Sequence, residues 1–152
     1  YLAPEHRGYL RAIERRMEEA GVPKEFRYRG ALDRGQKLEF LRSLDLFSVP
    51  CAYDEPKGLF LLEAMASGAP AVQPRRGAFP EILEKTGGGL LVEPDSAASL
   101  AEGMHRLWRD RALLAELGRN GAEGVREHYS AARMAARALD VYDSIANAET
   151  MA

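Results

Sequence analysis

Apolar residues recur at helical and strand-like spacings along the chain and predict an alternation of helices with short strands. Leu10, Ile13 and Met17 fall about one helical turn apart within residues 5–20, and Gly21 ends this first helix. Further helices are expected at residues 33–43, where Asp33 is the cap, and at 57–67, 80–85, 96–109, 111–127 and 131–146. Strands are expected at residues 26–30, 46–50, 71–73 and 89–92.

The order of these elements predicts an α/β fold. Helices alternate with strands up to residue 94, which favours a parallel sheet with helices on both faces. Ligands of such sheets bind at the carboxyl ends of the strands. From residue 95 onward only helices are expected, so residues 1–152 divide into an α/β part, 1–94, and a helical part, 95–152.

The stretch of residues 54–70 has the strongest pattern. Seven of the nine residues 59–67 are apolar, and a helix that is apolar on every side is a buried helix. Pro56 is tolerated at the mouth of this helix but not in its interior, and Gly68 ends it. Glu63 is then a carboxylate in a buried helix, and it requires a polar partner.

The mouth of this helix has the features of an anion site. The first amides of a helix lack internal partners and the helix dipole is positive there, while Gly58 allows a ligand to approach the backbone. Glu55 precedes the mouth, and Glu63 lies roughly 7 to 9 Å further along the axis. Two carboxylates with an anion site between them suit a nucleotide-sugar. The alternative is that Glu55 caps the helix and Glu63 is a core acid with a polar partner.

Composition and charge narrow the class of protein. The 152 residues suffice for one domain, and 46% apolar content with mixed charges indicates a globular chain. With 21 basic and 23 acidic residues the net charge is −2, which argues against a nucleic-acid binder with a basic surface. Cys51 is the single cysteine, and neither a membrane-spanning apolar run nor a signal peptide is recognisable, so a cytoplasmic location is expected.

The other titratable side chains indicate no metal or nucleophilic site. His6, His105 and His128 lie on separate predicted helices without the spacing of metal ligands, and a lone cysteine forms no catalytic pair with them. The two glutamates do not suit a glycosidase either. Glycosidase carboxylates face one bond at about 5 to 9.5 Å from each other, whereas here an anion site separates them.

Several motifs resemble one known family. Glu55 and Glu63, with seven residues between them, and the run 64–72 are similar to the signature of retaining glycosyltransferases of the glycogen-synthase and sucrose-synthase type, the group 1 enzymes of the GT-B fold. The similarity extends in the same order to segments 26–30, 45–50, 76–82, 88–94 and 129–130. It implies a Rossmann-like, donor-binding C-terminal domain of an enzyme that transfers a sugar from a nucleoside diphosphate to an acceptor with retained configuration. It further implies that no metal or other cofactor takes part.

The resemblance also implies roles for individual residues. Glu55 contacts hydroxyls of the donor sugar and is the candidate catalytic residue, while Glu63 binds the ribose. Backbone amides for the diphosphate come from three consecutive residues, Lys57, Gly58 and Leu59. Many relatives have glycine in place of Pro56, which donates no hydrogen bond. Leu32 corresponds to the position that covers the nucleobase. The alternatives are that Leu32 is a core residue and that Lys57 is a solvated lysine.

The pattern departs from the family in its first strands. Four strands are expected here, whereas the resembling domain holds about six in the order 3-2-1-4-5-6, and the first two are missing. The chain also opens on Tyr1 without an initiator methionine. We therefore expect a domain that is incomplete at its N-terminal side and that lacks the N-terminal acceptor-binding domain. Its unpaired strand edges invite self-association, and alone it should bind donor weakly and transfer nothing.

A different class of function stays open at this point. A Rossmann-like fragment that serves in assembly, or as a degenerate nucleotide-binding module, is favoured by the missing strands and disfavoured by the presence of both glutamates. A glycogen phosphorylase-like enzyme is a weaker option, because no pyridoxal-binding lysine motif is recognisable.

Overall fold

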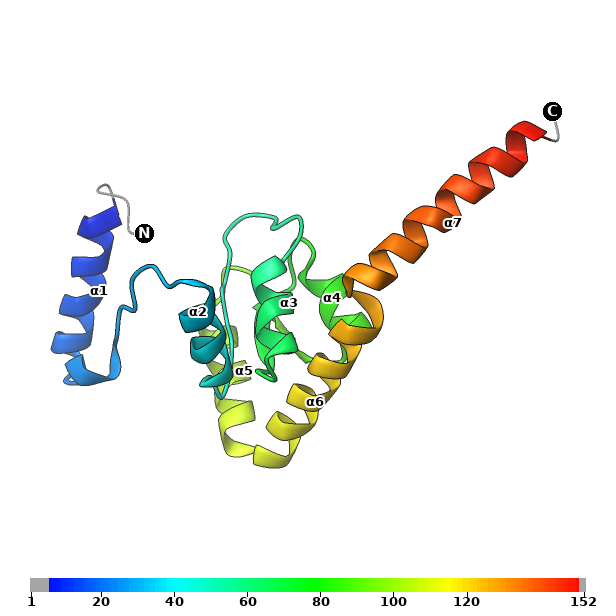
Figure 1. Ribbon diagram of the computed structural model, residues 1–152. Helices are drawn as coiled ribbons and strands as arrows, with labels where there is room; N and C mark the ends of the chain where they lie inside the picture. Colours follow the sequence, from blue (N-terminus) through cyan, green and yellow to red (C-terminus); the bar gives the residue numbers. More distant parts are fainter. Residues whose placement is uncertain (1–5, 151–152) are drawn as a thin grey trace. The chain divides into compact units, whose positions relative to one another are not determined.

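The computed structural model describes residues 6–150, and side chains up to residue 147, in two compact units. The first unit runs to Glu39 and the second begins at Phe40. Figure 1 labels the helices, whose bounds are α1 (Arg7–Glu19), α2 (Arg34–Arg42), α3 (Leu59–Ala66), α4 (Phe79–Thr86), α5 (Ala97–Arg109), α6 (Arg111–His128) and α7 (Ala131–Thr150). Each coincides with a predicted helix to within about four residues, the usual uncertainty of a boundary read from sequence.

The first unit contains helices but no strand within the residues described. α1 is followed by a 3-10 turn at Pro23–Glu25, and the chain then runs extended from Phe26 without a ladder partner. The predicted strand at 26–30 is therefore wrong. Its alternation of apolar and basic residues favours extended backbone, but a strand also requires a neighbour with which to pair.

The start of α2 is capped as predicted. The Oδ1 atom of Asp33 accepts a hydrogen bond from the amide of Gln36 at 2.9 Å, and the Oε1 atom of Gln36 accepts one from the amide of Asp33 at 3.1 Å. This reciprocal pair is a capping box, which satisfies two otherwise unpaired amides of the first turn.

The second unit is built on a short parallel sheet. Strands β1 (Ala71–Pro74) and β2 (Gly89–Val92) pair in register, with Ala71 opposite Gly89 and Pro74 opposite Val92. On the other side of β1, Phe47 forms a single parallel bridge to Ala71. β1 therefore lies between the Phe47 segment and β2, so the order in space follows the order in the chain.

The strand predicted at 46–50 is reduced to this one bridge. The amide of Phe47 donates to the carbonyl of Pro70 at 2.9 Å, and the amide of Val72 donates to the carbonyl of Phe47 at 3.0 Å. The next β1 amide on this side would belong to Pro74, which has no N–H group, so the ladder stops. The buried side chain of Gln73 continues the contact instead, because its Oε1 atom accepts from the amide of Val49 at 3.3 Å.

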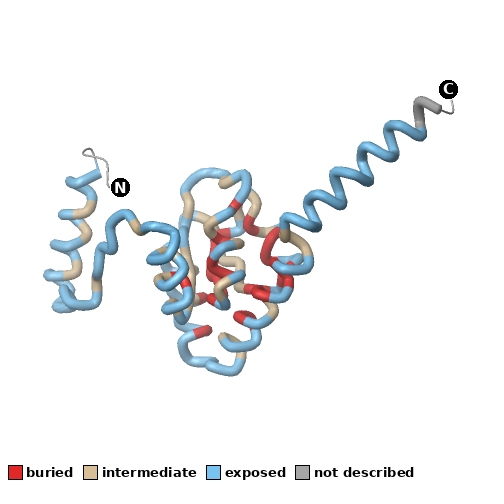
Figure 2. The backbone as a smooth tube through the Cα atoms, viewed as in Figure 1, coloured by how far each residue is buried: buried red, intermediate tan, exposed pale blue. Residues whose placement is uncertain are grey.

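Helices cover both faces of the sheet, which confirms the predicted α/β fold class. Alternate β1 residues point to opposite faces. Ala71 packs in one core with residues of α3, α4 and α6, namely Leu61, Met65, Phe79, Ile82, Leu83 and Val125. Val72 packs in a second core, with Leu107 of α5 and Leu117 of α6. Figure 2 shows the buried residues gathered in the middle of the second unit, with exposed residues outside them.

The last helix buries none of its described side chains. All residues from 131 to 147 are exposed, and they include the large apolar side chains Met134, Leu139, Val141, Tyr142 and Ile145. The helical character of the chain after residue 95 is as predicted. In residues 6–150, no helix is both long enough and apolar enough to span a bilayer.

Candidate functional site

Helix α3 starts at the carboxyl end of the Phe47 segment and is buried on one side only. Leu61 and Met65 are fully buried against β1, α4 and α6, and Ala64 is buried with Leu41 and Ala69. By contrast, Leu59 is 61% exposed and Glu63 is exposed one turn later. The expectation of a helix buried on every side, with Glu63 as a core carboxylate, is therefore wrong for the described chain. An all-apolar composition does not reveal whether enough neighbouring elements are present to cover every face of the helix.

The carboxylate of Glu55 occupies the mouth of α3. Its Oε1 atom accepts hydrogen bonds from the amides of Lys57 at 3.1 Å and Gly58 at 3.0 Å. Its Oε2 atom accepts a longer one, of 3.4 Å, from the hydroxyl of Tyr53. Two of the three amides predicted to bind phosphate therefore already hold an anion, but both precede the first helical residue, Leu59. The N-cap residue of α3 is Gly58, without a side-chain capping hydrogen bond, so Glu55 fixes the loop that enters the helix and is not its cap.

These hydrogen bonds stabilise the ionised form of Glu55. They hold the pKa of the Glu55 carboxyl below its usual value of 4.5, with the Gly58 amide as the larger cause and the Lys57 amide next. A carboxylate with a lowered pKa remains charged throughout the neutral range. The amides of Lys57 and Gly58 thus hold an anionic group of the protein itself.

The contact of Glu55 with the amides of Lys57 and Gly58 is expected to weaken in acid. Because the folded-state pKa is lowered, the stabilisation that Glu55 gives to the helix mouth is complete above about pH 4.5 and is lost as the pH falls through the lowered pKa. The amide proton resonances of Lys57 and Gly58 should titrate with a midpoint below 4.5, because each hydrogen bond weakens on protonation. Glu55→Gln, which has no titrating group at this position, is the control, and a wild-type midpoint at or above 4.5 would contradict the contact of Glu55 with the two amides.

Two glycines fix the backbone around this mouth. Gly58 has a left-handed φ of 61°, and a Cβ atom there would lie 2.8 Å from Ile82 Cδ1. Gly77, with a φ of 55°, lies directly beneath Glu55, since a Cβ atom there would come within 2.5 Å of the Glu55 carbonyl oxygen. The amide of Ala78 donates to that same oxygen at 2.8 Å. Gly58 is thus required by the fold itself, so its substitution cannot report on ligand approach alone.

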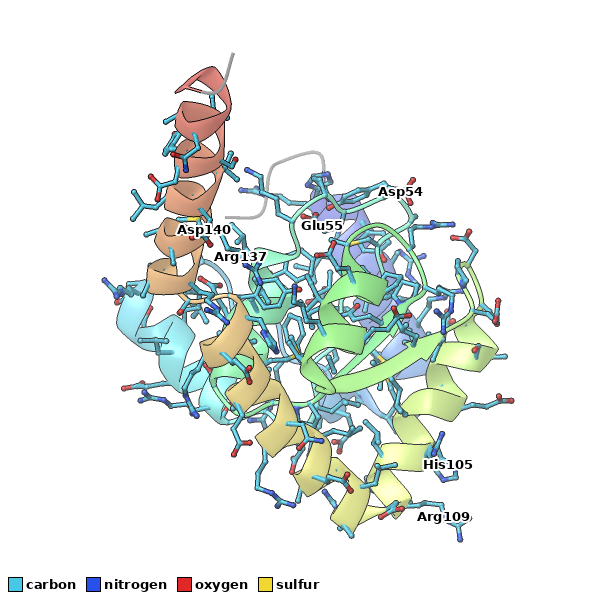
Figure 3. The ribbon with its side chains drawn as sticks, turned by 90° about the vertical axis from the view of Figure 1, so that its right-hand side faces the viewer. Asp54, Glu55, His105, Arg109, Arg137 and Asp140 are labelled. Atoms are coloured by element: carbon cyan, nitrogen blue, oxygen red, sulfur yellow. The ribbon has the colours of Figure 1, made fainter. Side chains whose placement is uncertain are left out.

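The structure brings together most of the predicted site residues. Figure 3 shows Asp54 and Glu55 on the loop at one end of the second unit, and His105 and Arg109 of α5 at the other end. Lys57 is exposed, Gly58 is buried, and Leu59 and Glu63 share an exposed stripe of α3 that begins at the mouth. Leu32 is half-buried in the first unit, immediately before Asp33, which caps α2. Its contact with the nucleobase remains a prediction.

Several residues of the site were not predicted from the sequence. Tyr53 contacts Glu55, and Arg76 forms an ion pair with Asp95 at 2.5 Å, beside Gly77. The only available signal for Tyr53 was its place two residues before Glu55. The partner of Arg76 lies 19 residues away, a separation at which a sequence carries no local pattern.

Within residues 6–147, no three His, Cys, Asp or Glu side chains are grouped so as to hold a metal ion. The predicted absence of a metal or cofactor stays a prediction.

The chain matches known glycosyltransferases over most of its length. A family model described as "Glycosyl transferases group 1" matches residues 7–124. Phosphatidyl-myo-inositol mannosyltransferase of Mycobacterium leprae is 32% identical over 131 residues, which are 86% of this chain and 35% of the relative. Sucrose-phosphate synthase from Thermosynechococcus elongatus superposes with a TM-score of 0.75 at 30% identity, over 91% of this chain and 34% of that one. Anabaena Alr3699/HepE, solved with UDP, superposes with a TM-score of 0.80 at 20% identity, over 93% and 38%.

A parallel sheet covered on both faces, with these structural neighbours, defines an α/β domain of the GT-B type. The chain belongs to the glycosyl transferases group 1 family. The resemblance of its motifs to group 1 glycosyltransferases of the GT-B fold is thereby confirmed. The chain spans about a third of the length of the mannosyltransferase and of the sucrose-phosphate synthase, at 35% and 34%.

Proposed function

We propose that this chain is the donor-binding part of a retaining glycosyltransferase that transfers a sugar from a nucleoside diphosphate to an acceptor. The observation that carries the proposal is the helix mouth of Glu55, Lys57 and Gly58 at the carboxyl end of the sheet, continued by the exposed stripe of Leu59 and Glu63. Open α/β sheets bind ligands at this end.

In this proposal each part of the donor has its own contact. The sugar hydroxyls face Glu55, the diphosphate faces the amides of Lys57, Gly58 and Leu59, and the ribose hydroxyls face Glu63. Leu32 covers the base. Charge on the departing diphosphate is stabilised by fixed amide dipoles, in place of a metal ion, which is a form of preorganised electrostatic catalysis. A neighbour of the same fold, Anabaena Alr3699/HepE, was solved with UDP, which agrees with this class of ligand.

Donor binding then includes an exchange of anions. The diphosphate and the Glu55 carboxylate compete for the amides of Lys57 and Gly58. When phosphate takes these amides, Glu55 is released beside the sugar, where it accepts hydrogen bonds from hydroxyls. In this proposal, the contact of Glu55 with the two amides is the ligand-free form of the site.

Titration of the chain with UDP, GDP and ADP by calorimetry tests this proposal. We expect saturable binding of one nucleotide, lost in a Glu63→Ala variant. If Glu63→Ala leaves nucleotide binding intact, Glu63 does not bind the ribose. If a folded chain binds no nucleotide at all, the alternative of a non-catalytic module is favoured.

The contribution of Glu63 is expected to be measurable in the full-length enzyme. Glu63→Gln should weaken nucleotide binding by roughly 1.5 to 3 kcal/mol, the range for hydrogen bonds to a charged group. Because Glu63 is exposed on α3, the substitution should leave the fold intact. Its control is Ala66→Gln, on the same exposed stripe but further from the mouth. An unchanged affinity in Glu63→Gln would contradict the ribose contact.

The proposal for the whole protein places the acceptor on a further, N-terminal domain and the enzyme in the cytoplasm. The chain alone then binds donor weakly and transfers nothing, and the edge at Phe47, which pairs through one bridge, is where additional strands or a second copy would join. The rival is a non-catalytic module of the same fold. It is favoured by one observation, namely that Glu55 already satisfies the amides on which donor binding depends.

A further inference from the structure

One ion pair joins the loops that follow the two strands. Arg76 lies in the loop between β1 and α4, and Asp95 lies in the turn between β2 and α5. The Nη1 and Nη2 atoms of Arg76 donate to the two carboxylate oxygens of Asp95, at 3.2 and 2.5 Å. The Arg76 side chain is only 20% exposed. A pair with two parallel hydrogen bonds fixes the relative orientation of its partners as well as their separation.

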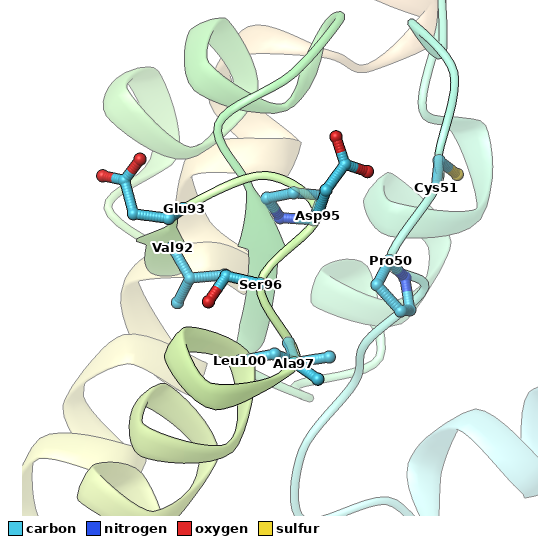
Figure 4. Close-up of a pocket in the computed structure, with 9 residues that line it drawn as sticks. Pro50, Cys51, Val92, Glu93, Asp95, Ser96, Ala97 and Leu100 are labelled. Atoms are coloured by element: carbon cyan, nitrogen blue, oxygen red, sulfur yellow. The ribbon is translucent and has the colours of Figure 1, made fainter.

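The Asp95 side of this pair is held in one conformation. Asp95 has a left-handed φ of 56°, the single non-glycine residue with positive φ among those described. Ser96 caps α5 by accepting from the amide of Ser99 at 3.1 Å, and the Ser99 hydroxyl accepts from the amide of Glu93 at 3.1 Å. Figure 4 shows the Asp95 carboxylate directed away from the first turn of α5. Strained backbone in a turn so fixed is typical of a functional constraint.

The Arg76 side of the pair leads directly to the backbone of Glu55. Gly77 follows Arg76 and lies so close beneath Glu55 that a Cβ atom would come within 2.5 Å of the Glu55 carbonyl oxygen. The amide of Ala78 donates to that same oxygen at 2.8 Å. A displacement of Arg76 is therefore passed through the next two residues to Glu55.

A cavity separates the Asp95 turn from the chain that leads to Glu55. It has a volume of about 200 Å³ and lies between this turn and residues 50–51 (Figure 4). The two segments do not support each other across this hollow. Arg76 interacts with both sides, because the pKa of its guanidinium is raised chiefly by the hydrogen bonds to Asp95 and further by the charge of Asp54. Arg76 thus links the turn to the loop of Glu55.

This link matters most when a ligand displaces the side chain of Glu55. Without ligand, the carboxylate is held by the amides of Lys57 and Gly58. In the proposed function a diphosphate takes these amides, and the placement of Glu55 then depends on its backbone. Because a misplacement of about 1 Å can cost roughly a hundredfold in rate, the backbone must be fixed from elsewhere at this moment.

We propose that Arg76 and Asp95 are positioning residues, which hold the backbone of Glu55 so that its carboxylate meets the donor sugar once the diphosphate has taken the amides. This role rests on the proposed function and adds to it two residues outside the helix mouth. An ordinary surface ion pair would contribute little to stability and nothing to the choice between ligands. The two cases are therefore separable by experiment.

The first measurement needs no ligand and compares Arg76→Lys with Arg75→Lys in the chain of 152 residues. Lysine keeps the charge but does not form two parallel hydrogen bonds. Arg75 is the matched control, because it pairs with Glu84 through one nitrogen at 3.3 Å and its side chain is 59% exposed. Hydrogen exchange of the Ala78 amide, followed by NMR, should be roughly fivefold faster in Arg76→Lys, since local opening becomes easier, and unchanged in Arg75→Lys.

The second measurement is calorimetric titration with UDP, GDP and ADP and with UDP-glucose, GDP-mannose and ADP-glucose. Arg76→Lys should bind the nucleoside diphosphate as the wild type does, because the amides of Lys57 and Gly58 are unchanged. Its affinity for the nucleotide-sugar should fall roughly fivefold or more, because the contact of Glu55 with the sugar is weakened. Asp95→Asn should give the same pattern, since asparagine tolerates the left-handed conformation of the turn but lacks the charge.

A double variant shows whether Arg76 acts through Glu55. In a Glu55→Ala background, Arg76→Lys should lower the affinity for the nucleotide-sugar no further. An additive loss, an equal loss for nucleoside diphosphate and nucleotide-sugar, or unchanged exchange of Ala78 would each overturn the inference. Failure of the proposed function is recognised separately, because the wild-type chain then binds neither kind of ligand, while the exchange of Ala78 still shows whether the pair holds Glu55.

Discussion

Replacement of Gly77 by alanine is expected to lower the free energy of unfolding of the second unit by about 3 to 5 kcal/mol, a loss that single substitutions reach only through a severe clash or a large cavity. A Cβ atom there would lie 2.5 Å from the carbonyl oxygen and 2.6 Å from the nitrogen of Glu55. Both atoms belong to backbone, so no side-chain rotation relieves the contact. The positive φ of 55° adds a strain of its own.

The matched control is Gly87→Ala. Gly87 has a φ of 62° and ends α4, but a Cβ atom there would meet its nearest neighbour, Asn120, at an ordinary 3.6 Å. It should therefore cost only about 1 kcal/mol, the strain of the backbone alone. Urea denaturation followed by circular dichroism compares the two variants. Equal losses would show that Glu55 does not rest on Gly77, and the packing described around the helix mouth would be wrong.

The helices of this fold were predictable from sequence because their signals are local. Ser96 and Asp110 cap α5 and α6 through their own side chains, and Gly87 ends α4 in a left-handed conformation. Such signals act within one turn and need no distant partner. The strand at 46–50 failed for the opposite reason, since Pro74, more than twenty residues later, removes the amide that its ladder requires.

The site was predictable in its location but not in its state. The spacing of Glu55 and Glu63 and the apolar run between them locate a helix mouth correctly. Which anion fills that mouth depends on the side-chain conformation of Glu55, and both alternatives fit the same residues. The burial of Glu63 depends on elements that pack on α3, and a single helix does not encode them. The Arg76–Asp95 pair joins two loops that only the folded sheet brings together.

Removal of the Glu55 carboxylate is expected to change the affinities for nucleoside diphosphate and nucleotide-sugar in opposite directions. In Glu55→Ala the amides of Lys57 and Gly58 lose their internal anion, so a diphosphate no longer has to displace it. Loss of this competing contact should make UDP, or whichever nucleotide binds, tighter by roughly fivefold. The nucleotide-sugar also gains these amides but loses the hydroxyl contacts to a charged group, so its affinity should fall by roughly tenfold or more.

Calorimetric titration of the chain with both ligands measures this divergence, and Glu55→Gln separates its causes. Glutamine retains a side-chain oxygen that accepts from the two amides but carries no charge, so it should tighten diphosphate binding less than alanine does while it weakens the contact to the sugar. If Glu55→Ala tightens both ligands equally, Glu55 is a competing anion without a role at the sugar, as the non-catalytic alternative requires. If it weakens both equally in a folded chain, the carboxylate is needed to shape the mouth and no exchange of anions takes place. Only the divergence supports a carboxylate that leaves the helix mouth when the diphosphate arrives and then contacts the sugar.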